Sequence, residues 1–143
     1  LFLCEDNDLA VHAKSNERRS FSFEKLVKAY SISYHELNEG YDLVKNYDFA
    51  KNVINIVRSQ NKPVFAKVKT SRYREHVGPG EDFNFGYREK IETLKWMKKD
   101  PLCYDLESIN EIEQKINNEI DEALDFAYKS PMTQESELLT DVI

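Results

Sequence analysis

The residues best suited to chemistry gather in one turn-rich loop, residues 70–83, which carries Arg72, Arg74 and His76. An arginine can bind a phosphate or a carboxylate through two donors, and a histidine can move a proton near neutral pH. Two glycines and a proline, Gly78-Pro79-Gly80, exclude a regular helix or strand there. Composition alone nevertheless favours a solvated surface loop whose charges pair with one another.

A second polar group follows the apolar run Leu1-Phe2-Leu3-Cys4 that opens the chain. Such a run is typical of a fully buried strand in a parallel sheet. The group itself is Glu5-Asp6-Asn7-Asp8. Open α/β sheets bind ligands at the carboxyl ends of their strands, and these oxygens suit Mg²⁺ or Ca²⁺. The same residue types are common in turns and helix caps, and without further observations that interpretation is favoured.

Hydrophobic periodicity predicts an α/β domain in which helices join parallel strands. We expect a polar loop at 9–22. The expected apolar stripes are Val44, Tyr47, Ala50, Val53, Ile54 and Val57 in one helix, and Ile91, Leu94 and Met97 in a later one. The expected strands are residues 1–4, 32–37 and 63–69. In the last, Val64, Ala66 and Val68 alternate with Phe65, Lys67 and Lys69. The expected helices are residues 23–30, 42–57, 87–99 and 106–128, followed by a tail without a clear period.

Composition limits the classes of function. The chain has 143 residues, which favours one domain, and its net charge of -6 argues against non-specific nucleic-acid binding. It shows no membrane-spanning run and no signal peptide, and Cys4 and Cys103 lack disulfide or metal-site spacing. We therefore expect a cytoplasmic protein. Because the chain opens without Met in an apolar run, we expect a fragment whose first half lies elsewhere.

The common catalytic motifs are missing from the sequence. It contains no HExxH, no EF-hand loop and no GxGxxG, and four glycines are too few for a glycine-rich phosphate cradle. On its residues alone, the chain is an incomplete catalyst.

The order of several short stretches carries a resemblance to a known family. They are Phe2-Leu3-Cys4-Glu5-Asp6-Asn7, Thr70-Ser71-Arg72-Tyr73-Arg74-Glu75-His76, Glu81-Asp82 with Gly86-Tyr87-Arg88, Lys99-Asp100-Pro101-Leu102, and Ser130-Pro131 with Glu137-Leu138-Leu139-Thr140-Asp141-Val142. Together they resemble the carboxyl-terminal half of the alpha subunit of thiamine-diphosphate-dependent 2-oxo acid dehydrogenases, the E1 component. The first stretch resembles the end of the family's thiamine-diphosphate motif, and the second resembles its Tyr-Arg-x-x-Gly-His-Ser loop.

The resemblance implies roles for individual residues. Asn7 falls where a side-chain amide binds Mg²⁺, and Leu9 falls where a backbone carbonyl does so. His76 falls on the catalytic loop histidine that faces the cofactor diphosphate and the incoming lipoyl arm, and Arg72 falls on the arginine that holds this loop. The resemblance also implies a thiamine-diphosphate-binding fold with a mostly parallel sheet flanked by helices. Residues 1–143 would form the carboxyl-terminal part of that domain, with 104–143 as its terminal helix and tail.

Three positions depart from the family's pattern. Asp6 replaces an asparagine, and Val77 replaces a serine that is phosphorylated in some members, which excludes phosphorylation at that position. Glu75 replaces a glycine and adds a negative charge beside the expected place of the diphosphate. The family's Gly-Asp-Gly segment would lie upstream of Leu1, and its activating glutamate belongs to the beta subunit. The chain alone would therefore hold one side of a cofactor site and be inactive by itself.

The function that the resemblance implies is that of an E1 alpha-like oxidoreductase. It is the oxidative decarboxylation of a 2-oxo acid with thiamine diphosphate and Mg²⁺, followed by acyl transfer to a lipoyl acceptor. The implied partners are an E1 beta subunit, in an α₂β₂ heterotetramer, and a lipoyl-bearing acyltransferase. The alternatives are a thiamine-diphosphate enzyme outside the lipoyl complexes, and a non-catalytic module in which the acidic last helix and tail dock a partner subunit.

Overall fold

The computed structural model describes residues 1–103 and 106–141. The chain divides into two compact units, Leu1–Tyr104 and Asp105–Ile143. The first unit contains all the strands of the described part and every residue for which the sequence predicts a site.

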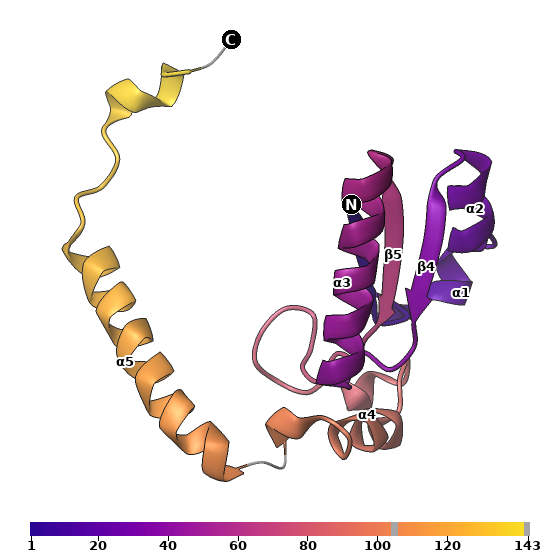
Figure 1. Cartoon of the computed structure of the whole chain (residues 1–143). Helices are drawn as coiled ribbons and strands as arrows, with labels where there is room; N and C mark the ends of the chain where they lie inside the picture. Colours follow the sequence, from indigo (N-terminus) through magenta and orange to yellow (C-terminus); the bar gives the residue numbers. More distant parts are fainter. Residues whose placement is uncertain (104–105, 142–143) are drawn as a thin grey trace. The chain divides into compact units, whose positions relative to one another are not determined.

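The first unit is built on a parallel sheet of three strands, β1 (Phe2–Asp6), β5 (Val64–Lys69) and β4 (Ser33–Leu37), in the order β1-β5-β4. β5 pairs in parallel with both neighbours. Helix α3 (Leu43–Gln60) connects β4 to β5 and lies against both strands (Figure 1). This arrangement confirms the predicted α/β class with helices flanking a parallel sheet.

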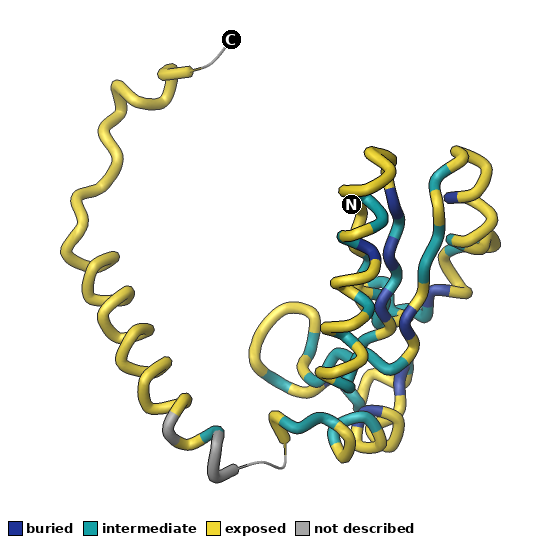
Figure 2. The backbone as a smooth tube through the Cα atoms, in the orientation of Figure 1, coloured by how far each residue is buried: buried dark blue, intermediate teal, exposed yellow. Residues whose placement is uncertain are grey.

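The core lies between β5 and α3. Val64 and Ala66 of β5 are fully buried, and they pack against Val53 of α3, which is 2% exposed. Figure 2 shows this burial as dark segments on the facing sides of the two elements. The alternate residue Phe65 points to the other face, where it contacts Phe23. The predicted alternation of β5 is therefore confirmed, because one of its faces meets α3 and the other meets α2 (Phe23–Ala29).

An ion-pair network on that second face joins the three strands. Lys67 of β5 lies 3.1 Å from the carboxylate of Asp6 and 3.0 Å from that of Glu36. Burial lowers the pKa of Lys67, but its bonds to Glu36 and Asp6 outweigh burial and raise the pKa. Burial likewise raises the pKa of Asp6, and the bonds from Lys67 and the Asp8 N–H lower it overall. The lysine thus remains charged between two carboxylates.

The prediction of an irregular loop at 9–22 is wrong in part. Residues Leu9–Ala10 (β2) and Ala13–Lys14 (β3) form a small antiparallel hairpin, and the short helix α1 (Ser15–Arg18) follows directly. Asp8 and Val11 both have a φ of 59°, in the left-handed region. Glycine, asparagine and aspartate usually mark such turns, so Asp8 fits this pattern, whereas Val11 gave no such signal.

Three expected apolar faces are corrected by the structure. Leu1 and Leu3 are 53% and 60% exposed, because β1 lies at the edge of the sheet that the described residues form. On α3, Val44 and Tyr47 of the expected stripe are exposed, whereas its member Val53 is buried as expected. The helix predicted at 87–99 is the shorter α4 (Lys90–Met97), in which Ile91 and Leu94 are exposed and Thr93 is buried. These differences arise because periodicity identifies a helix face but not what lies against it. The turns η1 (Phe83–Phe85) and η2 (Pro101–Cys103) flank α4.

The second unit contains helix α5 (Leu106–Lys129) and the turn η3 (Glu135–Leu139). The predicted last helix is therefore confirmed. The apolar side chains along one face of α5 are each about half exposed to solvent: Ile112, Ile116, Ile120 and Leu124. In the described part of the chain, none of the helices combines the length and the apolar character that a membrane span requires.

Candidate functional site

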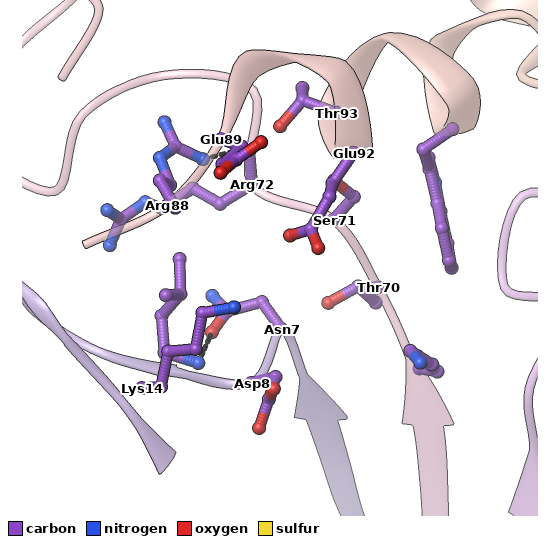
Figure 3. A pocket seen from close by; sticks show the side chains of 13 residues that line it. Asn7, Asp8, Lys14, Thr70, Ser71, Arg72, Arg88, Glu89, Glu92 and Thr93 are labelled. Atoms are coloured by element: carbon purple, nitrogen blue, oxygen red, sulfur yellow. Dashed lines mark hydrogen bonds between the residues drawn. The ribbon is translucent and has the colours of Figure 1, made fainter. Parts of the chain in front are cut away.

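A cavity of about 300 Å³ opens where β1 and β5 end. Asn7 and Asp8 follow β1, Thr70 follows β5, and α4 contributes Glu92 and Thr93 (Figure 3). The N–H of Thr70 donates to the carbonyl of Asp6 at 3.0 Å, which keeps the two strand ends together. The cavity therefore lies at the carboxyl edge of a parallel sheet, where α/β proteins bind ligands.

Gly40 allows a close backbone contact at the end of β5, next to Lys69 of the cavity lining. A Cβ at Gly40 would lie 2.1 Å from the backbone oxygen of Lys69, far inside van der Waals contact. The loop between β4 and α3 can cross the end of β5 only because residue 40 has no side chain.

Asn7 is held in place by its own backbone turn. Its Oδ1 accepts a hydrogen bond from the N–H of Leu9 at 3.0 Å, and Asp6 Oδ1 accepts one from the N–H of Asp8 at 3.1 Å. An amide oxygen has two lone pairs, so Asn7 Oδ1 can accept a second interaction. Asn7 and Leu9 both line the cavity. The oxygen donors expected at these positions are therefore ordered before any ligand binds.

The loop after β5 is tied down by a buried carboxylate. The Asp82 side chain is 0% exposed, and it accepts from Arg72 Nη2 at 2.8 Å and from the hydroxyl of Tyr87. Arg72 also donates to Tyr87 Oη at 2.7 Å and to the carbonyl of Val11 at 3.2 Å. We call Arg72, Asp82, Tyr87 and Arg88 the Asp82 cluster.

Arg88 connects this cluster to the loop backbone. Its Nε donates to Asp82 Oδ1 at 2.7 Å, its Nη1 donates to the carbonyl of Arg72, and its Nη2 donates to the carbonyl of Arg74 at 3.1 Å. The guanidinium also lies over the ring of Phe83, 4.5 Å from its centre. One side chain thereby fixes two carbonyls of the loop, so the first part of the loop is ordered rather than freely solvated.

The charges of the cluster are set by its contacts. Burial raises the pKa of Asp82, but hydrogen bonds from Tyr87 and Arg88 and the charges of Arg88 and Arg72 outweigh it and hold the pKa below its usual value. Burial and the bond to Asp82 raise the pKa of Tyr87. At neutral pH Asp82 is therefore an anion, and Tyr87 is a neutral donor to it.

The cavity lining is polar and carries charges of both signs. Its cations are Lys14, Lys69, Arg72 and Arg88, and its carboxylates are Asp8, Glu89 and Glu92. Arg72 and Arg88 are already paired with the buried Asp82, which leaves Lys14 and Lys69 as the other cations, and Thr70, Ser71 and Thr93 add three hydroxyls. Among residues 1–103 and 106–141, no group of three or more His, Cys, Asp or Glu side chains is placed to hold a metal ion. A cation here would need ligands of other kinds, such as amide and backbone oxygens.

The structure brings three of the four predicted site residues together. Asn7, Leu9 and Arg72 line the same cavity. His76 does not line it and lies exposed in the turn that follows. The resemblance pointed to Asp82, Tyr87 and Arg88 without predicting their contacts.

The sequence analysis missed the contribution of α4 and of Lys14 to the cavity. The side chains of α4 and its cap that line it are Glu89, Glu92, Thr93 and Trp96. Their spacing of three, four and seven residues marks one helical face, so this signal was present in the sequence. Lys14 gave no comparable signal, because it belongs to the hairpin that was expected to be irregular.

Comparison with known proteins adds an independent finding. No family profile matches the chain. The pyruvate dehydrogenase E1 component subunit alpha of Rickettsia bellii is 29% identical over 155 residues, which cover 99% of this chain and 46% of the relative. The corresponding protein of Rickettsia felis is 30% identical over 157 residues, and the match again covers 99% of this chain and 46% of the relative.

A plant relative shows the same similarity over a shorter stretch. The chloroplastic pyruvate dehydrogenase E1 component subunit alpha-3 of Oryza sativa is 30% identical over 113 residues, 73% of this chain and 26% of the relative. The chain thus spans less than half the length of the relatives that it matches. These matches confirm the resemblance that the motifs indicated, because the chain is similar over nearly its whole length to alpha subunits of the pyruvate dehydrogenase E1 component.

Proposed function

We propose that this chain supplies one side of the thiamine-diphosphate and Mg²⁺ site of an E1 alpha subunit. The reaction would be the oxidative decarboxylation of a 2-oxo acid with acyl transfer to a lipoyl acceptor. The observation that carries the proposal is that Asn7, Leu9 and Arg72 line one cavity at the carboxyl ends of two parallel strands. The similarity to E1 alpha subunits over 99% of the chain supports the same conclusion.

The proposal also assigns the parts of the chain. Residues 1–143 would correspond to the carboxyl-terminal part of the E1 alpha domain, with 104–143 as its terminal helix and tail. The remaining cofactor contacts would come from the rest of the alpha subunit and from an E1 beta subunit. A lipoyl-bearing acyltransferase would take up the acyl group.

The donors of the cavity fit a magnesium diphosphate. Asn7 Oδ1 retains a free lone pair and the carbonyl of Leu9 is a second candidate oxygen, while Lys14 and Lys69 of the lining are candidate partners for the phosphates. Thiamine diphosphate, when bound, supplies the stabilised carbanion that decarboxylation requires. The task of these side chains is to hold the metal and the charged end of the cofactor.

The loop residues would act on the substrate side. Arg72 is fixed by Asp82 and Tyr87, so it can hold the loop without moving. His76 is exposed, and its imidazole can donate a hydrogen bond or move a proton at an incoming acceptor. Arg72 would therefore hold the loop in position, and His76 would take part in acyl transfer to the acceptor.

Calorimetry on the complete alpha subunit with its beta subunit tests the cofactor site. We expect thiamine diphosphate to bind only with Mg²⁺, and Asn7→Ala to weaken binding roughly tenfold or more, since even outer-shell partners of a metal contribute that much. The control is Asn55→Ala, on the exposed side of α3. Magnesium-independent binding, or equal affinity of Asn7→Ala and the parent, would refute the assignment.

His76→Ala tests the transfer role in the same assembly. We expect acyl transfer to a lipoyl acceptor to fall more than cofactor affinity, because His76 lies outside the cavity. Val77→Ala, at a neighbouring position that is 80% exposed, is the control. Equal activity of His76→Ala and the parent would rule out this role.

One observation favours a second candidate, a non-catalytic module that docks a partner subunit. The stripe of α5 leaves Ile112, Ile116 and Ile120 about half exposed, which is unusual for side chains without a partner surface. Magnesium-dependent binding of thiamine diphosphate by the complete protein separates the two functions, because a docking module alone would not show it.

A further inference from the structure

The part of the loop that carries His76 is closed by one side chain. The N–H of Glu75 donates to the carbonyl of Gly80 at 3.0 Å. In return, the N–H of Gly80 donates to Glu75 Oε1, also at 3.0 Å. The carboxylate of Glu75 is thus folded back into the turn that it begins.

Two glycines make room for this carboxylate. A Cβ at Gly78 would lie 2.5 Å from Glu75 Oε1, and a Cβ at Gly80 would lie 2.9 Å from it. Gly78 also has a φ of +118°, which side chains rarely adopt, whereas Gly80 has no such backbone requirement. At position 80, therefore, the contact with the Glu75 side chain is what favours glycine.

Because the Glu75 carboxylate points into the turn, its negative charge is not expected to repel the diphosphate. Glu75 does not line the cavity, so its carboxylate does not face the place proposed for the diphosphate. The base of the turn is fixed next to it, because Arg88 Nη2 holds the carbonyl of Arg74. His76 and Val77, which follow Glu75, are exposed.

We propose that Glu75 is a positioning residue that keeps the 75–80 turn closed and so presents His76 to an incoming acceptor. The fixed base at Arg74 and the closed turn together limit the positions open to His76. The two hydrogen bonds between Glu75 and Gly80 that close the turn are present in the structure. The consequence of this closure for acyl transfer rests on the proposed function.

Hydrogen exchange at the Gly80 amide of the complete protein tests the closing of the turn. Glu75→Ala removes the acceptor, and a hydrogen bond to a charged group is worth roughly ten- to a hundredfold in exchange rate. Glu81→Ala is the matched control, because Glu81 is an exposed acid on the same loop whose partner, Lys90, is also exposed. If Glu75→Ala exchanges no faster than Glu81→Ala, the proposal is overturned.

Two conservative variants of Glu75 distinguish the length of the side chain from its charge as the cause of the protection at the Gly80 amide. Glu75→Gln keeps an oxygen at the same distance, and we expect it to keep most of the protection at Gly80. Glu75→Asp keeps the charge but withdraws the carboxylate by about 1.5 Å, and we expect it to lose protection as alanine does. Protection kept by aspartate and lost by glutamine would make charge the cause and overturn the positioning role.

The glycine at position 80 provides an independent check. A Cβ at this position would displace the Glu75 carboxylate, so Gly80→Ala is expected to accelerate exchange once intrinsic rates are corrected. In the Glu75→Ala background the same substitution is expected to have no further effect, since the displaced group is already absent. Additive effects of the two substitutions would contradict the contact.

Kinetics of the complete assembly test the consequence for His76. We expect Glu75→Ala to raise the KM for the lipoyl acceptor while cofactor affinity stays unchanged, and Glu75→Gln to restore the parent value. An unchanged KM would overturn the presentation of His76. If the parent assembly itself shows no cofactor-dependent activity, the proposed function fails, whereas the exchange result still decides whether Glu75 closes the turn.

Discussion

Replacing Asp82 by asparagine is the most informative test of the loop structure. The substitution removes the negative charge of the Asp82 cluster and keeps the shape of the side chain. Asp82 is 0% exposed, and the side chains of its two cationic partners, Arg72 and Arg88, are only 15% and 6% exposed. In the variant these guanidiniums would face each other across a neutral amide.

The expected loss of stability follows from this burial. Removing one partner of a buried ion pair costs about 3 to 5 kcal/mol, and the residual exposure of Arg72 favours the lower end, about 3 kcal/mol. For a chain of this size, that loss corresponds to a fall in Tm of roughly 10 °C.

The loss also depends on pH. The pKa of Asp82 in the folded protein lies below its ordinary value of 3.8. The stabilisation is therefore complete above that value and disappears as the pH falls through the folded-state pKa. The difference between Asp82→Asn and the parent is expected to be constant near neutral pH and to shrink below about pH 4.

Urea unfolding measures this difference directly. Trp96 is the single tryptophan of the chain, and it lines the cavity beside the cluster, so its fluorescence reports on this region. Glu81→Gln is the control, since its exposed pair with Lys90 is expected to contribute less than about 1 kcal/mol. A loss within about 1 kcal/mol of that control at neutral pH, or one that persists unchanged at about pH 2, would refute the reasoning.

Two further substitutions test the framework of the site. Gly40→Ala places a Cβ 2.1 Å from the oxygen of Lys69, so it is expected to cost about 1 to 3 kcal/mol in urea unfolding; an unaffected variant would show that the loop between β4 and α3 is free to move away from β5. Lys67→Met removes a cation beside Asp6 and Glu36, so the pKa values of both carboxyls are expected to rise in an NMR titration, and unchanged values at both would contradict the network.

The sequence was most informative where local rules determine the structure. The alternation of β5 predicted its two faces, and Asp42 marked the start of α3, where its carboxylate accepts from the N–H groups of Val44 and Lys45. Asn7 could be placed at a ligand-binding edge because it follows an apolar run that forms a parallel strand. These predictions required only neighbours along the chain.

The remainder depended on contacts between distant segments. The run at 1–4 reads as apolar whether its strand lies at the centre or at the edge of the sheet, and β5 takes the central place although it is the last of the three in sequence. Arg88 was expected inside a helix, yet its bonds to Asp82 and to two loop carbonyls hold it before the helix begins. Periodicity contains no information about such pairings.

The Asp82 cluster also has a consequence for how such a sequence can diverge. One carboxylate serves two guanidiniums and a phenol, so losing it harms three partners at once, whereas a joint replacement that also satisfies the loop carbonyls held by Arg88 leaves no charge without a partner. Single changes are therefore expected to be short-lived in a lineage, while joint replacement can persist. Among natural variants, positions 72, 82, 87 and 88 are expected to be inherited or lost as a block.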